Sequence, residues 1–575
     1  MFTDLCNYNV KVAEFKVDTK ADFIAEFLAL SNVSAVFQLS GGMTAFLADS
    51  IARLGKTPIV NARHEQSAGF AAECATRFSG VPSVALATSG PGASNLISAI
   101  ASSYFDSVPT IFITGQVNQS EFKKSVLQRQ NGFQELDIVE MVRGITKLAV
   151  RVSTDSNLSL EFERAWETAM SGRPGPVLID IPIDVQQEKY LRSGQKLSSI
   201  HVSSHGDLLD KGVKTLGEWL GESTRPLFLL GGGIRTSNSV ELVRELVQQW
   251  KVPSVHSLMA VDVLEESNPM RVGMIGSYGN RWANRALAKS DLVVVLGSRL
   301  DIRQTGSDVS SFRKHKKIFR ADIDSHELNG RVVADYSVEG DLRSLLGTFL
   351  QMDYSKTNTG WIESIREDAE LHPQASEQSS LSGINPTDLM LWISELGQHS
   401  NGYIVDVGQH QMWAAQSIKV TAQQRFMTSG GLGAMGFAIP GAIGAAIQKP
   451  GRWIAITGDG CAQLSISELQ TIQHYNLPIT ICVINNNQHG MVAQFQEHNT
   501  SKRFIGTREG YSAPNFSQVA AAFGIESRRL DTITNLEESP DLLSKYPGPL
   551  LLEFMVSNEA KALPKMSTGV TIHDL

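Results

Sequence analysis

A carboxylate and a carboxamide follow two apolar runs near the C-terminal end of this 575-residue chain. Asp459 lies in a Gly-Asp-Gly turn after the run RWIAI, and Asn486 follows the run ITICVI; a helical pattern, SISELQTIQHYN, lies between them. This order predicts a β-α-β unit, and in open parallel sheets ligands bind at the carboxyl ends of the strands. Asp and Asn oxygens suit Mg²⁺, and glycines let a main chain approach a phosphate closely. The segment predicts a magnesium and diphosphate site; the alternative is an ordinary crossover with Asp and Asn in its turns.

Glu65 carries a second chemical hypothesis. It ends the apolar segment PIVNARHE, and no Lys or Arg follows within the next several residues to neutralise it. A carboxyl group in an apolar pocket has a raised pKa and can hold a proton near neutral pH. The alternative is a carboxylate in the first turn of a helix, where the helix dipole stabilises its charge. The residues alone leave both interpretations open.

Helical and apolar segments alternate along the whole chain. In the first third, helices are predicted for ADFIAEFLAL, MTAFLADSIARL and QSAGFAAECATRFSG, and strands for AVFQL, PIVNARHE, VPSVALAT and TIFITGQV. Such alternation predicts parallel sheets covered by helices on both faces, which is an α/β fold. The pattern begins again at RPLFLLGGG and at YIVDVGQHQ, after polar stretches that are typical of linkers. We therefore predict three doubly wound parallel-sheet domains, at residues 1–188, 189–360 and 361–575.

Composition excludes several classes of function. The formal net charge of −8 argues against a nucleic-acid or anionic-membrane partner. No apolar run is long enough to span a bilayer, and the first residues lack the basic and apolar regions of a signal peptide. The four cysteines, Cys6, Cys74, Cys461 and Cys482, form no CxxC motif and no paired framework. We expect a cytoplasmic protein with reduced thiols.

Longer motifs give the chain a specific resemblance. HEQxxxFAAE, ATSGPGASN, DSVPTIFITGQV and GFQE follow one another in the first third, and VGQHQMWAAQ, TSGGLGAMGFAIP and NNNQHGMVAQF in the last. The Gly-Asp-Gly turn with its later Asn-Asn resembles the signature of enzymes that use thiamine diphosphate (ThDP). The whole series is similar to the acetohydroxyacid (acetolactate) synthase group of that family. The resemblance implies a pyrimidine-binding domain, a central FAD-type domain and a diphosphate-binding domain, with ThDP, Mg²⁺ and a structural FAD as cofactors.

The resemblance assigns roles to single residues around ThDP. Glu65 would contact N1′ of its aminopyrimidine ring, Gln134 would hydrogen-bond reaction intermediates, and Met435 would bend the cofactor so that its two rings meet. The side chains of Asp459 and Asn486 and the carbonyl of Gln488 would hold Mg²⁺. The other expected ThDP-binding positions are Gly41, Gly42, Pro91, Asn95, Val407, Gly408, Gln409, His410, Gly433, Gly458, Gly460, Cys461, His489, Gly490, Met491 and Val492.

Some of these residues have simpler interpretations when they are taken alone. A place in the protein core is the alternative for His410 and for Met435. The segment from His489 to about Ser512 is polar and contains glycine, so we predict a loop there that acts as a lid over the cofactor.

The central domain carries the positions that match the FAD-contacting pattern of the group. They are Arg173, Gly232, Gly233, Gly297, Ser298, Arg299, Asp301, Arg303, Asp322 and Asp341. The fork of an Arg fits a diphosphate, and an Asp at the end of a strand fits ribose hydroxyls. The Met-His pair of the group reads Ser277-Tyr278 here, which weakens the expected isoalloxazine contacts more than the diphosphate contacts. The alternative is a structural domain that binds nothing.

The resemblance implies decarboxylation of a 2-oxo acid, pyruvate, and transfer of its acetyl (hydroxyethyl) unit to a carbonyl acceptor. Three positions depart from the acetolactate synthase pattern: Phe495 replaces a Trp that favours 2-ketobutyrate, Ile183 replaces a Lys, and Met43 replaces an Ala. These changes favour a ketone, cyclic diketone or keto-sugar acceptor, while acetolactate formation from two pyruvates is comparably supported. A simple 2-oxo acid decarboxylase, a diketone hydrolase and a non-catalytic subunit are the further alternatives.

The resemblance also implies an oligomer. In this architecture the residue at the Glu65 position serves ThDP that is held by the third domain of a neighbouring chain. A homodimer or homotetramer is therefore expected. The sequence does not define a regulatory subunit.

Overall fold

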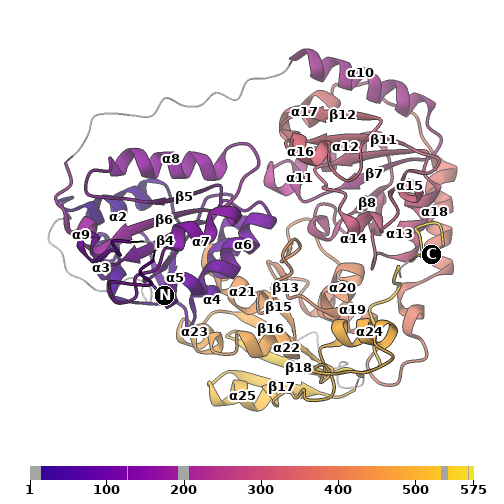
Figure 1. Ribbon diagram of the computed structural model, residues 1–575. Helices are drawn as coiled ribbons and strands as arrows, with labels where there is room; N and C mark the ends of the chain where they lie inside the picture. Colours follow the sequence, from indigo (N-terminus) through magenta and orange to yellow (C-terminus); the bar gives the residue numbers. More distant parts are fainter. Residues whose placement is uncertain (1–14, 126, 192–205, 533–541, 567–568, 575) are drawn as a thin grey trace.

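Three six-stranded parallel sheets follow one another along the chain (Figure 1). Their strand orders are β2-β1-β3-β4-β6-β5, β12-β11-β10-β7-β8-β9 and β14-β13-β15-β16-β18-β17. The computed structural model describes residues 15–125, 127–191, 206–532, 542–566 and 569–574. The predicted α/β fold with three parallel-sheet domains is confirmed; Cys6 and most of the first linker lie outside the described residues.

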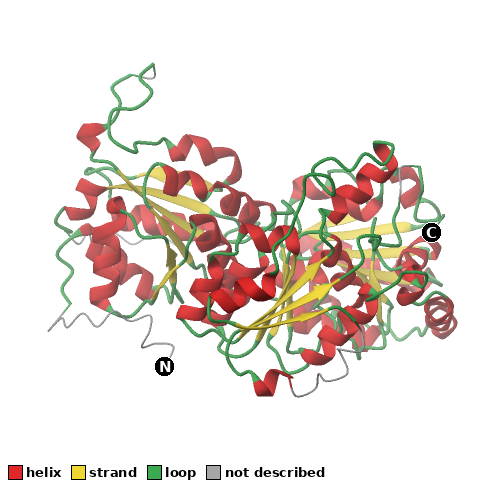
Figure 2. Cartoon of the chain, turned by 90° about the horizontal axis from the view of Figure 1, so that it is seen from below, coloured by secondary structure: helices red, strands yellow, loops and turns green. Residues whose placement is uncertain are grey.

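The first sheet is buried on both faces, as its nearly continuous apolar strands predict. Helices cover it on either side (Figure 2). Its strands are β1 (Val36–Gln38), β2 (Ile59–Asn61), β3 (Val84–Ala87), β4 (Ile111–Gln116), β5 (Leu148–Arg151) and β6 (Val177–Pro182). Its helices are α2 (Lys20–Leu30), α3 (Ala45–Leu54), α4 (Glu65–Ser79), α5 (Pro91–Asn95), α6 (Ile97–Phe105), α7 (Ile138–Val142), α8 (Leu158–Met170) and α9 (Ile183–Gln187).

The second sheet repeats this design. Its strands are β7 (Pro226–Leu230), β8 (Ser254–His256), β9 (Arg271–Met274), β10 (Leu292–Leu296), β11 (Lys317–Asp322) and β12 (Tyr336–Glu339). Its helices are α10 (Gly206–Glu222), α11 (Gly233–Thr236), α12 (Val240–Trp250), α13 (Arg281–Lys289), α14 (Ile302–Thr305), α15 (Val309–Arg313), α16 (Ser325–Leu328), α17 (Leu342–Phe349) and α18 (Thr359–Leu371). Trp361 and Ile365 of α18 join the core of this domain, so the expected division at 360/361 falls inside a helix that packs here.

The third sheet contains the β-α-β unit around Asp459. Its strands are β13 (Gly402–Val405), β14 (Arg425–Thr428), β15 (Trp453–Gly458), β16 (Ile479–Asn485), β17 (Glu526–Leu530) and β18 (Leu550–Met555). Its helices are α19 (Pro386–Leu396), α20 (Gln409–Ser417), α21 (Ala438–Gln448), α22 (Asp459–Leu464), α23 (Glu468–His474), α24 (Gly490–Asn499), α25 (Phe516–Ala522) and α26 (Leu542–Lys545).

The first and third domains share one hydrophobic core. Helix α4 packs directly on α21 (Figure 1). A Cβ at Gly444 would overlap the carbonyl of Ala71, so a glycine is needed for this close approach. The rings of Phe70 and Phe437 meet edge to face at 5.4 Å. This contact fixes the start of α4, and hence Glu65, relative to the third domain.

Two expectations about local structure need correction. Glu65 does not end a strand: β2 ends at Asn61, and Glu65 is the first residue of α4, as the helix-terminus alternative has it. The segment after His489 is not a continuous loop, because Gly490–Asn499 forms α24. Its run of Met, Ala, Gln and Glu consists of good helix formers, which the polar composition concealed. No helix in the described part of the chain combines the length and apolarity that crossing a bilayer requires.

Candidate functional site

A small cavity of about 70 Å³ lies at the carboxyl ends of β13, β15 and β16. Its lining contains almost every position of the third domain that was predicted to bind ThDP: Val407, Gly408, Gln409, His410, Met435, Gly458, Asp459, Gly460, Cys461, Asn486, Gln488, His489, Gly490, Met491 and Val492. Gly433 is the exception, although a Cβ there would lie 3.8 Å from Val407. The fold therefore brings these predicted positions, which lie in separate segments of the chain, to one cavity.

His410 offers a buried nitrogen to this cavity. The side chain is 5% exposed, and its Nε2 atom has no hydrogen-bond partner among the described residues. Burial lowers the pKa of His410 to about 3, so the imidazole is neutral. A Cβ at Gly408 or at Gly458 would lie 2.8 Å from the ring. The two glycines therefore make room for the histidine, and the free Nε2 fits a polar ligand.

Three residues that line this cavity carry the oxygens predicted to hold Mg²⁺. Asp459 is 3% exposed, and burial raises the pKa of its carboxyl group to about 6. Among the described residues no Lys or Arg forms an ion pair with it. Asn486 is also buried, and its Nδ2 donates to Gln409 Oε1 at 3.1 Å, which leaves its carbonyl oxygen for another partner. The Gln488 carbonyl, which accepts from the N–H of Gly490 at 2.9 Å, would add a main-chain oxygen to this carboxylate and carboxamide. Such a set of oxygens fits a hard cation.

The loop that carries Met435 is anchored by a buried acid. Asp406 directly follows β13, and its two carboxylate oxygens accept hydrogen bonds from the N–H groups of Gly436 and Ala438, both at 3.0 Å. Thr457 on β15 donates to the same carboxylate at 3.2 Å. The sequence analysis did not include Asp406 among the site residues. Its place directly after a buried strand could have indicated that it lies at the site.

The first domain gathers a second set of predicted residues around Glu65. This side chain is 6% exposed, and Asn95 Nδ2 donates to its Oε2 at 3.0 Å. A Cβ at Gly92 would lie 3.3 Å from Oε1, so Pro91 and Gly92, which open α5, pass close to the carboxylate. Gly41 packs on Thr88 so tightly that a Cβ would overlap its side chain. Gly42 begins the short helical turn that follows.

Gln134 and Met43 lie beside this group. A Cβ at Gly90 would lie 2.8 Å from Cβ of Gln134, which has a left-handed backbone with φ of 65°. The N–H of Met43 donates to Thr88 Oγ1 at 3.3 Å, and its carbonyl accepts from Gln186 Nε2 at 2.8 Å. Met43 is therefore held beside the Glu65 group by main-chain bonds.

The two groups do not line a common cavity in the described part of the chain. Every lining residue of the 70 Å³ cavity lies between 407 and 492, so none of the described first-domain residues contributes. Of the other predicted substrate contacts, Ile183 opens α9, and Phe495 lies on α24 with 57% of its surface exposed. The arrangement fits a site that a second copy completes.

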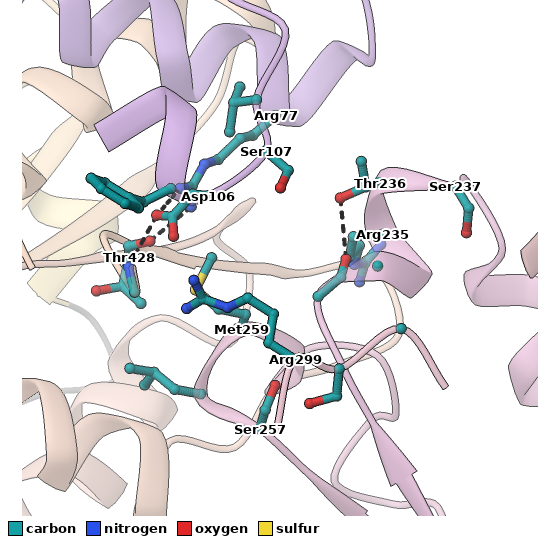
Figure 3. Close-up of a pocket in the computed structure, with 18 of the residues that line it drawn as sticks. Arg77, Asp106, Ser107, Arg235, Thr236, Ser237, Ser257, Met259, Arg299 and Thr428 are labelled. Carbon is teal, nitrogen blue, oxygen red and sulfur yellow. Dashed lines mark hydrogen bonds and ion pairs between the residues drawn. The ribbon is translucent and has the colours of Figure 1, made fainter. Parts of the chain in front are cut away.

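A larger cavity, about 370 Å³, lies where the three domains meet. All ten positions predicted to contact FAD line it: Arg173, Gly232, Gly233, Gly297, Ser298, Arg299, Asp301, Arg303, Asp322 and Asp341. Figure 3 shows Arg77, Asp106 and Thr428 on one wall and Arg235, Thr236 and Ser237 on another. Arg77 donates to the carbonyl of Thr428 at 2.7 Å, which joins the first and third domains at this wall.

Several of these ten residues also have structural partners. A Cβ at Gly233 would lie 2.8 Å from Cα of Gly297, so the two turns need glycine for packing alone. Asp301 and Asp341 cap the N-termini of α14 and α17. Because Gly233 is needed for packing, the glycine turn that contains it does not by itself indicate a nucleotide site.

Three other members of the set differ in how many partners they have. Burial raises the pKa of Asp322, which ends β11. Arg299 is bonded only to Asp301 among the described side chains, at 3.3 Å. Arg173 is paired with Asp324 and Glu327, at 3.0 and 2.7 Å. The cavity therefore presents arginines and a buried acid at strand ends, a combination that fits a nucleotide with a diphosphate.

Comparison with known proteins agrees with this geometry. Family models of the thiamine pyrophosphate (TPP, another name for ThDP) enzymes match all three domains: the N-terminal TPP binding domain at residues 18–141, the central domain at 213–349 and the C-terminal TPP binding domain at 406–554. The chain is 34% identical over 519 residues to the acetolactate synthase large subunit of Porphyra purpurea, covering 88% of this chain and 86% of that protein.

Two further relatives extend the match to nearly the whole chain. The acetolactate synthase large subunit of Lactococcus lactis is 32% identical over 567 residues, covering 97% of this chain and 96% of that protein. Acetolactate synthase 1, chloroplastic, of Nicotiana tabacum is 33% identical over 579 residues, covering 96% and 84%. The chain therefore belongs to the thiamine pyrophosphate enzyme family and is a ThDP-dependent carboligase of the acetolactate synthase type.

Proposed function

We propose that the chain decarboxylates pyruvate and transfers the resulting two-carbon unit to a second carbonyl compound. The observation that carries this proposal is that the chain buries both expected groups: Glu65 in the first domain, and Asp459 with Asn486 in the third. When bound, ThDP supplies the carbon that adds to the 2-oxo acid and accepts the electrons released with CO₂. The test is release of CO₂ from pyruvate by purified protein with ThDP and Mg²⁺; a protein that binds ThDP and releases no CO₂ would fit the non-catalytic alternative.

The residues of the chain have distinct parts in this proposal. The Glu65 carboxyl group would hold the proton at N1′ of the aminopyrimidine. Met435, beside the cavity of the third domain, would fix the bend between the two rings. The neutral His410 and the glycine turns would contact the diphosphate. Gln134 would hydrogen-bond the bound substrate.

Mg²⁺ is the second cofactor of the proposal. The buried Asp459, the free carbonyl oxygen of Asn486 and the Gln488 carbonyl would hold it next to the diphosphate. Chelation should therefore release ThDP and stop CO₂ evolution, and added Mg²⁺ should restore both. Full ThDP binding in the presence of a chelator would argue against the site.

FAD is proposed for the 370 Å³ cavity. It would be structural, because carboligation without oxidation moves no net electrons. Ser277 and Tyr278, which replace the Met-His pair, line the cavity, so looser isoalloxazine contacts are expected. The purified protein should carry a flavin absorption band, and Arg299→Ala should weaken FAD binding. If FAD neither co-purifies nor raises the thermal midpoint of the protein, the domain is structural alone.

The acceptor is the finer part of the proposal, and two candidates stand. Formation of acetolactate from two pyruvates is favoured by the relatives named above. A ketone, cyclic diketone or keto-sugar acceptor is favoured by Ile183 and Phe495, because an apolar side chain replaces a lysine and a smaller ring replaces a tryptophan. Product analysis with pyruvate plus 2-ketobutyrate, and separately with pyruvate plus a cyclic ketone, distinguishes them. Formation of keto-acid products alone would remove the second candidate.

We also propose a homodimer or a dimer of dimers. Exposed apolar side chains lie near both groups of predicted site residues, the one in the first domain and the one in the third. In the third domain Leu464, Val492 and Phe495 are 63%, 50% and 57% exposed, and near Gln134 the side chains of Leu127 and Phe133 are 92% and 80% exposed. Exposed apolar surface of this kind marks interaction sites. Sedimentation of the purified protein tests the assembly.

A further inference from the structure

Tyr511 contacts the carboxylate that is proposed to bind the metal. Its hydroxyl group donates to Oδ2 of Asp459 at 3.0 Å. The same oxygen accepts from the main-chain N–H of Gln488 at 3.2 Å. These two hydrogen bonds to one oxygen define the orientation of the Asp459 carboxylate. The bond from Tyr511 comes from a side chain, and the bond from Gln488 comes from the main chain.

The hydroxyl group of Tyr511 is itself fixed in place. Gln463 Nε2, on α22, donates to it at 3.1 Å. The aromatic ring meets the ring of His489 edge to face at 4.5 Å. A Cβ at Gly460 would lie 2.7 Å from the His489 ring, so this histidine is packed against the Gly-Asp-Gly turn. Tyr511 therefore has one defined position over the turn.

The segment that carries Tyr511 is bound to the Asn-Asn loop at three further points. Arg508 Nε donates to the side-chain oxygen of Gln488 at 2.6 Å. The N–H of His489 donates to the carbonyl of Thr507 at 3.1 Å, and the N–H of Ala513 donates to Asn487 at 3.1 Å. Residues 507–513 thus bridge the turn after β15 and the loop after β16, which together hold the three proposed metal ligands.

We propose that Tyr511 is a positioning residue for the divalent cation: its hydroxyl group orients the Asp459 carboxylate and so sets the affinity of the site for Mg²⁺. Hydrogen-bond partners of metal-ligating carboxylates orient them, and loss of one typically costs about 10–100-fold in metal affinity. This inference rests on the Mg²⁺ site proposed above. Tyr511, which lies 52 positions after Asp459 in the sequence, is thereby added to the residues of the proposed Mg²⁺ site.

The test measures Mg²⁺ binding by calorimetric titration of chelated, full-length protein in the presence of excess ThDP. It compares the wild type with Tyr511→Phe and Tyr511→Ala. Tyr511→Phe keeps the ring contact with His489 and removes only the hydroxyl group. We expect it to weaken Mg²⁺ binding by about 10-fold or more, with the thermal midpoint of the metal-free protein unchanged. Tyr104→Phe, which removes a hydroxyl group from a 38% exposed side chain of the first domain, is the matched control.

The outcomes separate this inference from the proposals beneath it. If the wild type and Tyr511→Phe bind Mg²⁺ equally well while Tyr511→Ala does not, the ring alone matters and the inference is wrong. If the wild type binds ThDP with no divalent cation, the metal site and this inference are both wrong. If Mg²⁺ binding follows the expectation while no carbon–carbon bond forms, the inference holds and the proposed carboligation fails.

Discussion

The carboxylate of Glu468, on α23 of the third domain, accepts a hydrogen bond at 2.9 Å from the main-chain N–H of Arg63 in the first domain. Its second oxygen accepts from Thr471 Oγ1 at 2.7 Å, and the carboxylate is fully buried. Nearby, the N–H of Asn61 donates to the hydroxyl group of Tyr475 at 3.0 Å. The segment that leads into Glu65 is therefore held by the domain that contains Asp459 in the same chain.

Glu468→Ala should disturb this link. The Arg63 N–H would lose its buried acceptor, at a cost of about 1–3 kcal/mol in the free energy of unfolding. A displacement of Glu65 by about 1 Å can lower a rate by on the order of 100-fold, so CO₂ release should fall while ThDP affinity changes little. Glu468→Gln keeps an acceptor oxygen and is the control. Full turnover by Glu468→Ala would show that the link does not position Glu65.

His256 should make the stability of the protein depend on pH. It is 3% exposed, and burial, with the nearby Arg271 charge, lowers its pKa to about 3. As the pH falls below the unfolded value of about 6.5, the unfolded state takes up a proton that the folded state does not. Folding stability should then fall by about 1.4 kcal/mol per pH unit from this group.

The measurement is the thermal midpoint of the wild type and His256→Gln between about pH 6.5 and pH 5. The variant lacks this titration, so its midpoint should fall less steeply with acid. His410 has a pKa lowered in the same direction and is present in both proteins, so the difference isolates His256. Parallel slopes would mean that His256 takes up its proton in the folded state.

Mixing two inactive variants tests whether the site is shared between chains. Glu65→Gln and Asp459→Asn each destroy one half of it. If each site takes Glu65 from one chain and Asp459 from another, a mixed dimer contains one intact site, and random mixing restores about a quarter of the wild-type activity. The measurement is CO₂ release after the two purified variants are dissociated and reassociated together. No recovery, with mixed dimers verified by mass, would place both residues in one chain's site.

The sequence predicted those parts of the site that depend on local order. The β-α-β unit around Asp459, in which α22 and α23 lie between β15 and β16, follows from strand ends and turns, which are short-range features. The ten predicted FAD positions, which all line one cavity, came from the resemblance to the family. The start of α4 at Glu65 was harder, because a helix terminus and a strand end differ by only a few residues. Helix α24 was missed because its polar face resembles a loop in composition.

Other residues could not be found from local patterns at all. Glu468 and Arg63 are 405 positions apart, and Tyr511 and Asp459 are 52 apart. Their contacts exist only because α23 lies against the first domain and because residues 507–513 fold back over the Asn-Asn loop. Asp406 is different, since its place directly after β13 was visible in the sequence.

The proposed chemistry depends most on an acidic side chain that acts on ThDP held by a buried metal site. The most direct test is the initial rate of CO₂ release from pyruvate by the wild type and Glu65→Gln, both saturated with ThDP and Mg²⁺. Because the carboxyl group would take part in proton transfer, the rate of the variant should fall by about 10²–10⁴-fold, while the affinity for ThDP stays within a few-fold. A Glu65→Gln protein that releases CO₂ at the wild-type rate would contradict the account.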